Sequence, residues 1–340
     1  MVVLPQEDRL MNGVTRTPKR SASHDAFQWQ SSAFILQFSV VLFVVACCVA
    51  GCGWSERAAV VVYTSQDQVY AEPILNEFSA QTGIKVGAIY DSEAVKTVGL
   101  VNRLLAERRN PQCDIFWNNE ELRTHQLAEQ GVFQETNSWQ PLGFRSRRIV
   151  VNTNRLPIAS APRNLSELTN AMWRGKVAIA YPLFGTTATH FLALRQEWGE
   201  ARWKPWCEAL QANQPLMVDG NSVVVKLVGR GEAWIGLTDS DDIAAGQREG
   251  LPLAAMPITE ETLLIRNTVA VIRNAPHASA ARRVLDYLQR PDVIRKLVAA
   301  DALEGLSPAE IGVRTLKPDW DVLVHELGTA TKTLKEVFLR

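Results

Sequence analysis

Cysteine is scarce in the body of this 340-residue chain. Three of its five cysteines, Cys47, Cys48 and Cys52, lie near the N-terminus, and only Cys113 and Cys207 follow them. Two thiols cannot form a framework of disulfides, and no cysteine–histidine spacing is typical of a zinc site. We interpret Cys113 and Cys207 as small buried apolar residues.

The chain also lacks an excess of charge of either sign. Its 36 lysine and arginine residues balance 36 aspartate and glutamate residues. A nucleic-acid surface would need a basic stripe, so no nucleic-acid partner is expected. The sequence also shows no internal repeat and no low-complexity linker.

Residues 1–51 are typical of an export signal. The basic residues Arg16, Lys19 and Arg20 precede an almost wholly apolar run over residues 33–50, and a basic segment followed by such a run is the layout of a secretory signal. We therefore predict that residues 1–51 are absent from the mature protein. Met11 is an alternative start, because the segment before the apolar run is long.

The apolar run closes on Val49-Ala50-Gly51-Cys52, which resembles the lipobox of bacterial lipoproteins. The resemblance implies that Cys52 is acylated and becomes the first mature residue. Acyl chains contribute about 0.8 kcal/mol per buried CH₂, so two or three chains anchor a protein stably. The alternative is an uncleaved membrane helix, since about 18 apolar residues just span a bilayer. Either way the body is expected outside the cytoplasm, in the periplasm, held at a lipid membrane.

From residue 58 onward, short apolar runs alternate with amphipathic helical stretches. This alternation predicts an α/β fold with mostly parallel sheets flanked by helices on both faces. The expected strands cover residues 59–63, 84–90, 114–117, 148–151, 176–181, 216–219, 233–237 and 262–272. The expected helices near the C-terminus cover residues 277–288, 292–300 and 322–338.

The two blocks of alternating elements predict two lobes. We place residues 58–150 together with 262–340 in lobe 1, and residues 151–261 in lobe 2. Because no linker separates these blocks, the chain is expected to cross between lobes through strands, near residues 148–154 and 262–272. Strand hinges of this kind suit a protein that closes around a ligand.

Polar residues follow five of the expected strands, where ligands bind in open parallel sheets. The helix N-termini at this edge carry unsatisfied N–H groups, which suit an anionic ligand group. The alternative is that the polar residues after each strand only cap the helix that follows. The prediction therefore depends on five such segments lying at the same edge of the sheets. The candidate ligand residues are Ser65, Gln66, Asp67, Asn118, Asn119, Glu120, Gly185, Thr186, Thr187, Asn221, Ser222, Thr238, Asp239, Asp241 and Asp242.

The acidic cluster of Asp239, Asp241 and Asp242 exceeds what one helix cap requires. Each carboxylate gains only about 0.3–1 kcal/mol from the helix dipole, and three so close together repel. A cation would relieve the repulsion, either a metal ion or an amine, unless the cluster is a solvated helix start. We predict that Asp239→Asn with Asp241→Asn abolishes ligand binding and leaves the melting temperature without ligand unchanged or higher. His190, one turn into the helix after Gly185, is a candidate to face the same cleft.

Several segments together resemble the bacterial extracellular solute-binding proteins of ABC importers. They are Val61-Val62-Tyr63-Thr64-Ser65-Gln66, Asp114-Ile115-Phe116-Trp117 and Asn267-Thr268-Val269-Ala270-Val271-Ile272. The resemblance is strongest to the group with ferric-iron-, 2-aminoethylphosphonate- and thiamine-binding proteins. It implies a two-lobed periplasmic-binding-protein fold, capture of a small polar ligand by lobe closure, and delivery to an ABC permease.

The resemblance leaves the ligand open. Ferric-binding members generally use adjacent tyrosines after the strand expected here at residues 233–237, where this chain has Thr238 and Asp239. Iron remains a candidate because carboxylates are also hard anionic donors. An aminoalkyl phosphonate is the other candidate, with its amine at the aspartates and its phosphonate at Gly185-Thr186-Thr187. No cofactor is expected; a bound metal ion would be cargo, and its ligands are not assigned.

Two other functions are compatible with the sequence. A membrane-anchored sensor or docking protein would share the fold and differ in its partners. A transferase on this fold is the third reading, with Cys113 as a conceivable nucleophile. A reactive cysteine needs a paired base, and Cys113 begins its strand, at the end away from the ligand edge. The chain is therefore not expected to be an enzyme.

Overall fold

The computed structural model describes residues 60–91, 98–134, 139–305, 312 and 314–339. All of them belong to the unit Ala58–Arg340. The predicted signal and Cys52 lie outside the described residues, as does the alternative start at Met11.

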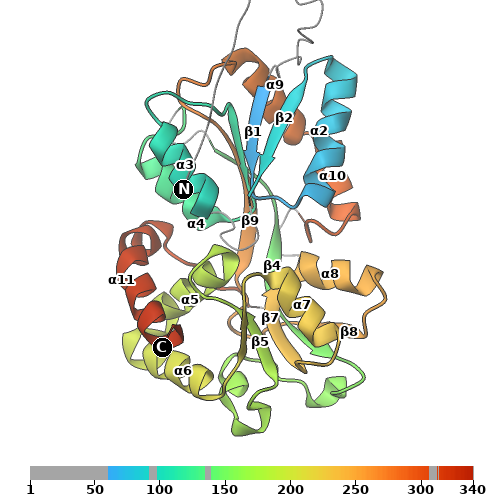
Figure 1. Ribbon diagram of the computed structural model, residues 1–340, viewed down its shortest axis with the longest axis vertical. Coiled ribbons are helices and arrows are strands. Elements are labelled where there is room, and N and C mark those ends of the chain that lie inside the picture. The colour runs from blue at the N-terminus through green and yellow to red at the C-terminus, as the bar shows by residue number, and fades with distance from the viewer. Residues whose placement is uncertain (1–59, 92–97, 135–138, 306–311, 313, 340) are drawn as a thin grey trace, which may run out of the picture. The chain divides into compact units, whose positions relative to one another are not determined.

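Paired strands form one path in the order β2-β1-β3-β9-β4-β7-β5-β6, with β8 paired to β4 (Figure 1). β1 is parallel to β2 and β3, and β5 is parallel to β6 and β7, whereas β4 and β9 run antiparallel to their neighbours. The strands are β1 (Val60–Thr64), β2 (Val86–Tyr90), β3 (Ile115–Asn118), β4 (Gln140–Asn152), β5 (Val177–Ala180), β6 (Leu216–Val218), β7 (Ile235–Asp239), β8 (Leu253–Met256) and β9 (Leu264–Val271). We call β1, β2, β3 and β9 the first half-sheet, and β4 to β8 the second.

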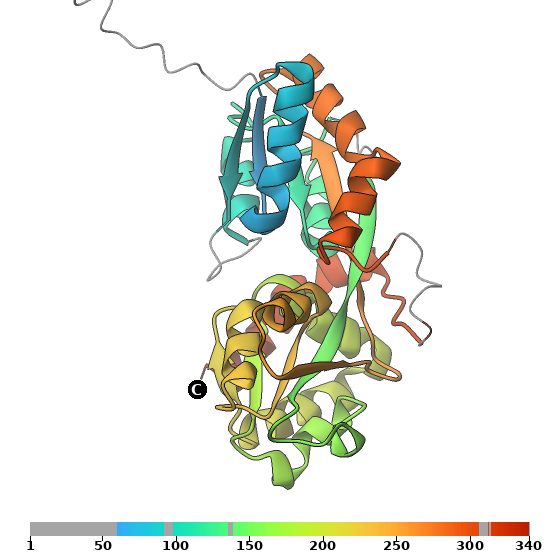
Figure 2. The ribbon, with the colours of Figure 1, turned by 90° about the vertical axis from the view of Figure 1, so that its right-hand side faces the viewer.

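The strands β4 and β9, which we call the crossing strands, join the half-sheets. β4 pairs with β9 from Gln140 to Ser146 and with β7 from Arg147 to Val151. Figure 2 shows β4, in green, running from one group of strands to the other. β4 is much longer than the strand expected at residues 148–151, because proline, glycine and charged residues interrupt the apolar pattern of its first half.

Helices cover both faces of each half-sheet (Figure 1). Alternate residues of a strand enter different cores: Val177 and Ile179 of β5 belong to one cluster, and Ala178 and Ala180 to another. This burial confirms the predicted α/β class. The helices are α2 (Gln68–Thr82), α3 (Val98–Glu107), α4 (Glu121–Glu129), α5 (Gly185–Trp198), α6 (Glu200–Ala212), α7 (Asn221–Gly229), α8 (Ser240–Arg248), α9 (Ala278–Leu288), α10 (Pro291–Ala299) and α11 (Trp320–Phe338).

One helix adds to what the sequence predicts, and the predicted helix α11 makes contacts that the sequence does not indicate. No helix was expected at α6, although Trp203, Trp206, Cys207 and Leu210 bury one face of it with helical spacing. α11 packs against α5 and α6 and also against α4. It therefore contacts residues of both predicted lobes, and the lobe boundaries stay a prediction.

The interpretation of the two body cysteines is confirmed. Both are free and buried, and burial raises the pKa of both thiols. Because the thiolate is the reactive form, neither Cys113 nor Cys207 has the properties of a nucleophile.

Candidate ligand site at the helix starts

Three helices of the second half-sheet begin at one small cavity. α5, α7 and α8 follow β5, β6 and β7, and none of their N-cap residues, Phe184, Gly220 and Asp239, makes a side-chain cap hydrogen bond in the described structure. The starts of α5 and α7 therefore retain N–H groups and partial positive charge, whereas Asp241 and Asp242 in the first turn of α8 offset the charge of that helix start. The cavity has a volume of about 30 Å³, room for about one water molecule or ion.

The structure brings eight predicted residues to the lining of this cavity. They are Asn119, Gly185, Thr186, Thr187, Asn221, Asp239, Asp241 and Asp242. Ser65, Gln66, Asn118, Glu120 and Thr238 are buried close by but do not line it, and Asp67 and Ser222 are half-buried outside the lining. The edge predicted from strand order thus gathers residues from both half-sheets, while their role in ligand binding stays a prediction.

The first half-sheet contributes amide groups. Ser65 Oγ donates to Asn118 Oδ1 at 2.6 Å, and Asn119 N donates to Ser65 Oγ at 2.9 Å. Gln66 Oε1 accepts from Asn267 Nδ2 at 2.9 Å. Within the described residues, Asn119 Nδ2 and Gln66 Nε2 are buried donors with no hydrogen-bond partner. Unsatisfied buried donors cost free energy, so the amide of Asn119, which lines the cavity, is suited to hold an acceptor group of a ligand, whereas Gln66 lies outside the lining.

Two buried arginines neutralise the acidic cluster. Arg147 Nη1 lies 2.6 Å from Asp239 Oδ1, and Arg145 contacts both Asp239 and Asp241 at 3.2 Å. Burial opposes ionisation of Asp239, but the charges of Arg147 and Arg145 outweigh it and hold the pKa of Asp239 below its usual value. The cation that the cluster was expected to need is therefore supplied in part by the chain itself.

Sequence reasoning missed both arginines. They were overlooked because the strand was expected to start at Arg148. A signal was present: residues two apart on a strand share a face, so Arg145 and Arg147 had to point the same way.

The predicted threonines and asparagine beside the second half-sheet form a hydrogen-bond network with Asp239. Its Oδ2 accepts hydrogen bonds from Thr186 Oγ1 at 2.7 Å and Asn221 Nδ2 at 3.1 Å. Thr187 Oγ1 donates to Asn221 Oδ1 at 3.3 Å. These side chains form a network behind the helix starts, which leaves the backbone N–H groups as the main donors toward a ligand.

Contacts between the predicted lobes close the site. Glu120 caps α4 and accepts from Thr189 Oγ1 of α5 at 2.8 Å, and burial raises the pKa of Glu120. Arg248 of α8 donates to the Tyr70 hydroxyl at 2.8 Å and pairs with Asp301. Since the cavity holds about one water molecule, a larger solute enters only if such contacts open.

His190 does not face the cavity. It is fully buried, and its Nε2 contacts the backbone oxygen of Glu261 at 2.8 Å. Burial, together with the charge of Arg147, lowers the pKa of His190 to about 3. The imidazole therefore remains neutral in the folded protein throughout the physiological pH range.

This buried imidazole predicts a pH dependence of stability. Below about pH 6.5, His190 takes up a proton in the unfolded chain but not in the folded chain. As the pH falls, this difference lowers the free energy of unfolding by up to about 1.4 kcal/mol per pH unit. Urea unfolding between about pH 5 and 7.5 checks this, with His190→Leu as the comparison. As the pH falls, the free energy of unfolding is expected to decrease less steeply for the variant than for the unaltered protein. Equal pH dependences of the two proteins would contradict the account.

The comparisons with known proteins identify the family. Residues 59–300 match the family described as bacterial extracellular solute-binding protein. This chain belongs to that family. The solute-binding protein is 22% identical over 305 residues to the major ferric iron-binding protein of Neisseria meningitidis, covering 82% of this chain and 90% of that one.

Solved structures agree with the fold. The iron-bound HitA of Pseudomonas aeruginosa matches with a TM-score of 0.72 at 17% identity. AfuA of Actinobacillus pleuropneumoniae, with fructose-6-phosphate bound, matches with a TM-score of 0.72 at 19% identity. Each match covers 82% of this chain and 98% of the other. These neighbours are two-lobed periplasmic binding proteins, which confirms the predicted fold.

Membership of the family fixes the general function. Solute-binding proteins of this family capture a small ligand outside the cytoplasm and work with an ABC permease; they are not enzymes. This confirms the expected importer function. In the part of the chain that is described, no helix combines the length and apolarity needed to cross a membrane.

Proposed function

We propose that this solute-binding protein captures a small organic anion with a phosphate or phosphonate group. The observation that carries the proposal is the convergence of the α5, α7 and α8 starts on one cavity without side-chain caps. Each helix start is equivalent to roughly +0.5 of an elementary charge, and such starts bind phosphate through their N–H groups.

The rest of the lining suits the remainder of such a solute. Asn119 offers a buried N–H donor on the facing wall, and Arg145 adds a guanidinium group. Asp241 and Asp242 stand beside Arg145 and would accept from an amine or hydroxyl. Aminoalkyl phosphonates and phosphorylated sugars both have this chemistry, and AfuA shows that a neighbour with this fold holds fructose-6-phosphate.

Ferric iron is the second candidate. Asp239, Asp241 and Asp242 offer carboxylate oxygens within 4.8 Å of one another, and several relatives are named for ferric iron. The buried charges of Arg145 and Arg147 stand against it, because they already pair with Asp239 and Asp241 and would repel a trivalent cation. The arginines therefore favour the phosphorus-containing solute over iron, and because Asp219, Asp239, Asp241 and Asp242 all line the cavity, that solute needs an amine or hydroxyl groups to contact them.

A thermal-shift panel on the chain from Gly53 onward tests the proposal. It would contain 2-aminoethylphosphonate, fructose 6-phosphate, inorganic phosphate and ferric citrate. A ligand at about 100 times its dissociation constant stabilises by about 2.7 kcal/mol, which raises the melting temperature by several degrees. We expect a phosphorus-containing solute to give this rise; a rise with ferric citrate alone would favour iron.

Capture is proposed to follow closure of two lobes, residues 58–150 with 262–340 and residues 151–261, about the crossing strands. β4 pairs with strands of both half-sheets, and β9 lies beside it. A strand shared in this way can bend without breaking either core.

The protein is also proposed to be a lipoprotein anchored through Cys52, because this cysteine directly follows the apolar run of the signal. Cys52→Ala is expected to prevent acylation and to move the protein from the membrane fraction to the soluble fraction. Fractionation of cells that express each form measures this. Tight membrane association of the variant would instead indicate an uncleaved spanning helix.

A further inference from the structure

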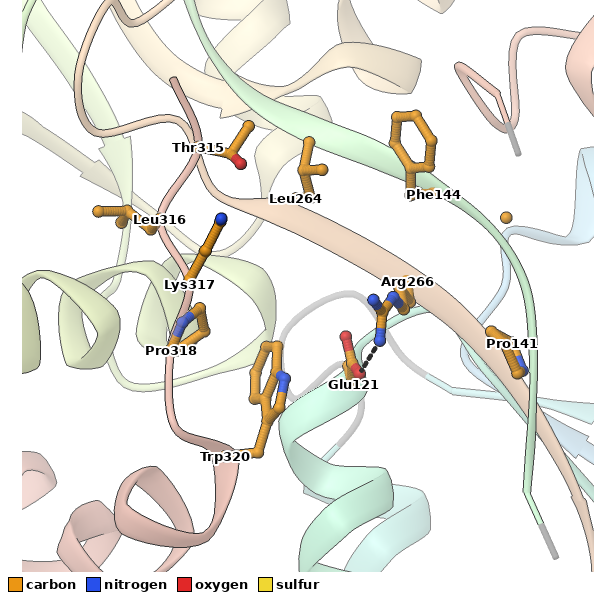
Figure 3. Close-up of a pocket in the computed structure, with 11 residues that line it drawn as sticks. Glu121, Pro141, Phe144, Leu264, Arg266, Thr315, Leu316, Lys317, Pro318 and Trp320 are labelled. Carbon is orange, nitrogen blue, oxygen red and sulfur yellow. Dashed lines mark hydrogen bonds and ion pairs between the residues drawn. The ribbon is translucent and has the colours of Figure 1, made fainter. Parts of the chain in front are cut away.

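A second cavity, of about 630 Å³, lies away from the helix starts. Its volume is within the range of small-molecule sites, about 300–1,000 Å³. None of the fifteen predicted ligand residues lines it; its walls come from both crossing strands, the start of α4 and the segment that leads into α11. Figure 3 shows these walls.

The crossing strands separate this cavity from the candidate ligand site. Phe144 of β4 and Arg266 of β9 line the second cavity, whereas their neighbours Arg145 and Asn267 contact Asp239 and Gln66 at the ligand site. Successive side chains of a strand point to opposite faces. The two cavities therefore lie on opposite faces of the same two strands and cannot share one ligand.

The charge of the second cavity is positive. Arg266 Nη1 pairs with the buried carboxylate of Glu121 at 3.1 Å. Lys317 is exposed at the opposite wall, and no ion pair joins it to a carboxylate of the described residues. In Figure 3, Lys317 extends from one wall toward Thr315 and Leu264, and the Arg266 guanidinium on the other wall turns to Glu121. One positive charge remains without compensation, which favours an anion.

The rest of the wall is apolar and includes a fixed indole ring. Phe144 and Leu264 line one side. Trp320 stacks on His125 with centroids 5.4 Å apart and an interplanar angle of 10°, and His125 makes an edge contact with Trp139. This packing holds the Trp320 ring in place, so the cavity offers a planar apolar surface beside a cation.

We propose that this cavity is a second ligand site, which takes a small organic anion with a planar apolar body, such as an aromatic carboxylate. Its carboxylate would pair with Lys317 and its ring would lie against Trp320, Phe144 and Leu264. The site is independent of the proposed phosphate site, and both crossing strands form part of its wall.

Calorimetric titration of the purified full-length chain with 2-naphthoate tests the proposal. We expect saturable binding that Lys317→Gln weakens about tenfold, the worth of one charged hydrogen bond. Lys332→Gln, which removes an exposed lysine of α11 that does not line this cavity, is the matched control and should change nothing. The neutral 2-naphthalenemethanol should bind at least about tenfold more weakly than the anion.

Any of the following results would overturn the second site. The first is no heat of binding at millimolar 2-naphthoate. The second is equal weakening by Lys317→Gln and Lys332→Gln, or equal affinity for the neutral analogue. The third is loss of 2-naphthoate binding in Asn119→Asp, because this would locate the anion at the helix starts instead.

Discussion

Asp239→Asn is expected to lower the free energy of unfolding by about 3–5 kcal/mol, since breaking a buried ion pair leaves its partner charge uncompensated. Asp239 is 1% exposed and lies between Arg145 and Arg147, which are also buried. It further accepts hydrogen bonds from Thr186 and Asn221. Urea unfolding near neutral pH, without added ligand, measures the loss.

The matched control is Asp292→Asn. Asp292 pairs with Arg290 at the surface, and exposed pairs contribute only about 0–1 kcal/mol. If Asp239→Asn costs no more than this control, the arginine pair does not depend on Asp239. The ion pairs reverse the expectation drawn from the sequence that Asp239→Asn with Asp241→Asn would leave the melting temperature unchanged or higher.

Asn119→Asp is expected to weaken binding of a phosphonate or phosphate solute by about a hundredfold. The substitution replaces a buried donor with a carboxylate that repels the anion, and a hydrogen bond to a charged group is worth about 1.5–3 kcal/mol. Asn119 Nδ2 makes no hydrogen bond within the described residues, so the change breaks no donor contact among them. Calorimetry with the solute that gives the largest thermal shift measures the loss.

The same substitution separates the two candidate ligands. An added carboxylate would strengthen ferric binding, because hard cations favour anionic oxygen donors. Asn274→Asp, at an exposed turn, is the matched control and should alter neither affinity. Tighter ferric binding together with unchanged phosphonate binding would favour iron over the anion.

Much of the fold could be predicted because local patterns agree with tertiary packing. The β-branched run at Val60–Val62 became β1, and Gly83 ends α2 in the left-handed conformation, as its position suggested. The edge of the candidate site followed from the rule that ligands bind beyond the carboxyl ends of parallel strands. That rule requires only strand order and direction, which alternating elements supply.

The parts that were missed depend on contacts distant in sequence. The first half of β4 is a strand because β9 pairs with it, although Pro141, Gly143 and Arg145 break its apolar pattern. Arg145 and Arg147 resemble surface charges until the fold places Asp239 beside them. The aspartates alone therefore suggested an external cation, and only the three-dimensional arrangement shows the internal one.

The most direct measurement is a crystal structure of the chain from Gly53 onward with the phosphorus-containing solute that gives the largest thermal shift. The account predicts the phosphorus group at the starts of α5 and α7, within hydrogen-bonding distance of their backbone N–H groups and of Asn119. A phosphorus group bound elsewhere, or a metal ion held by Asp239, Asp241 and Asp242 in its place, would contradict it.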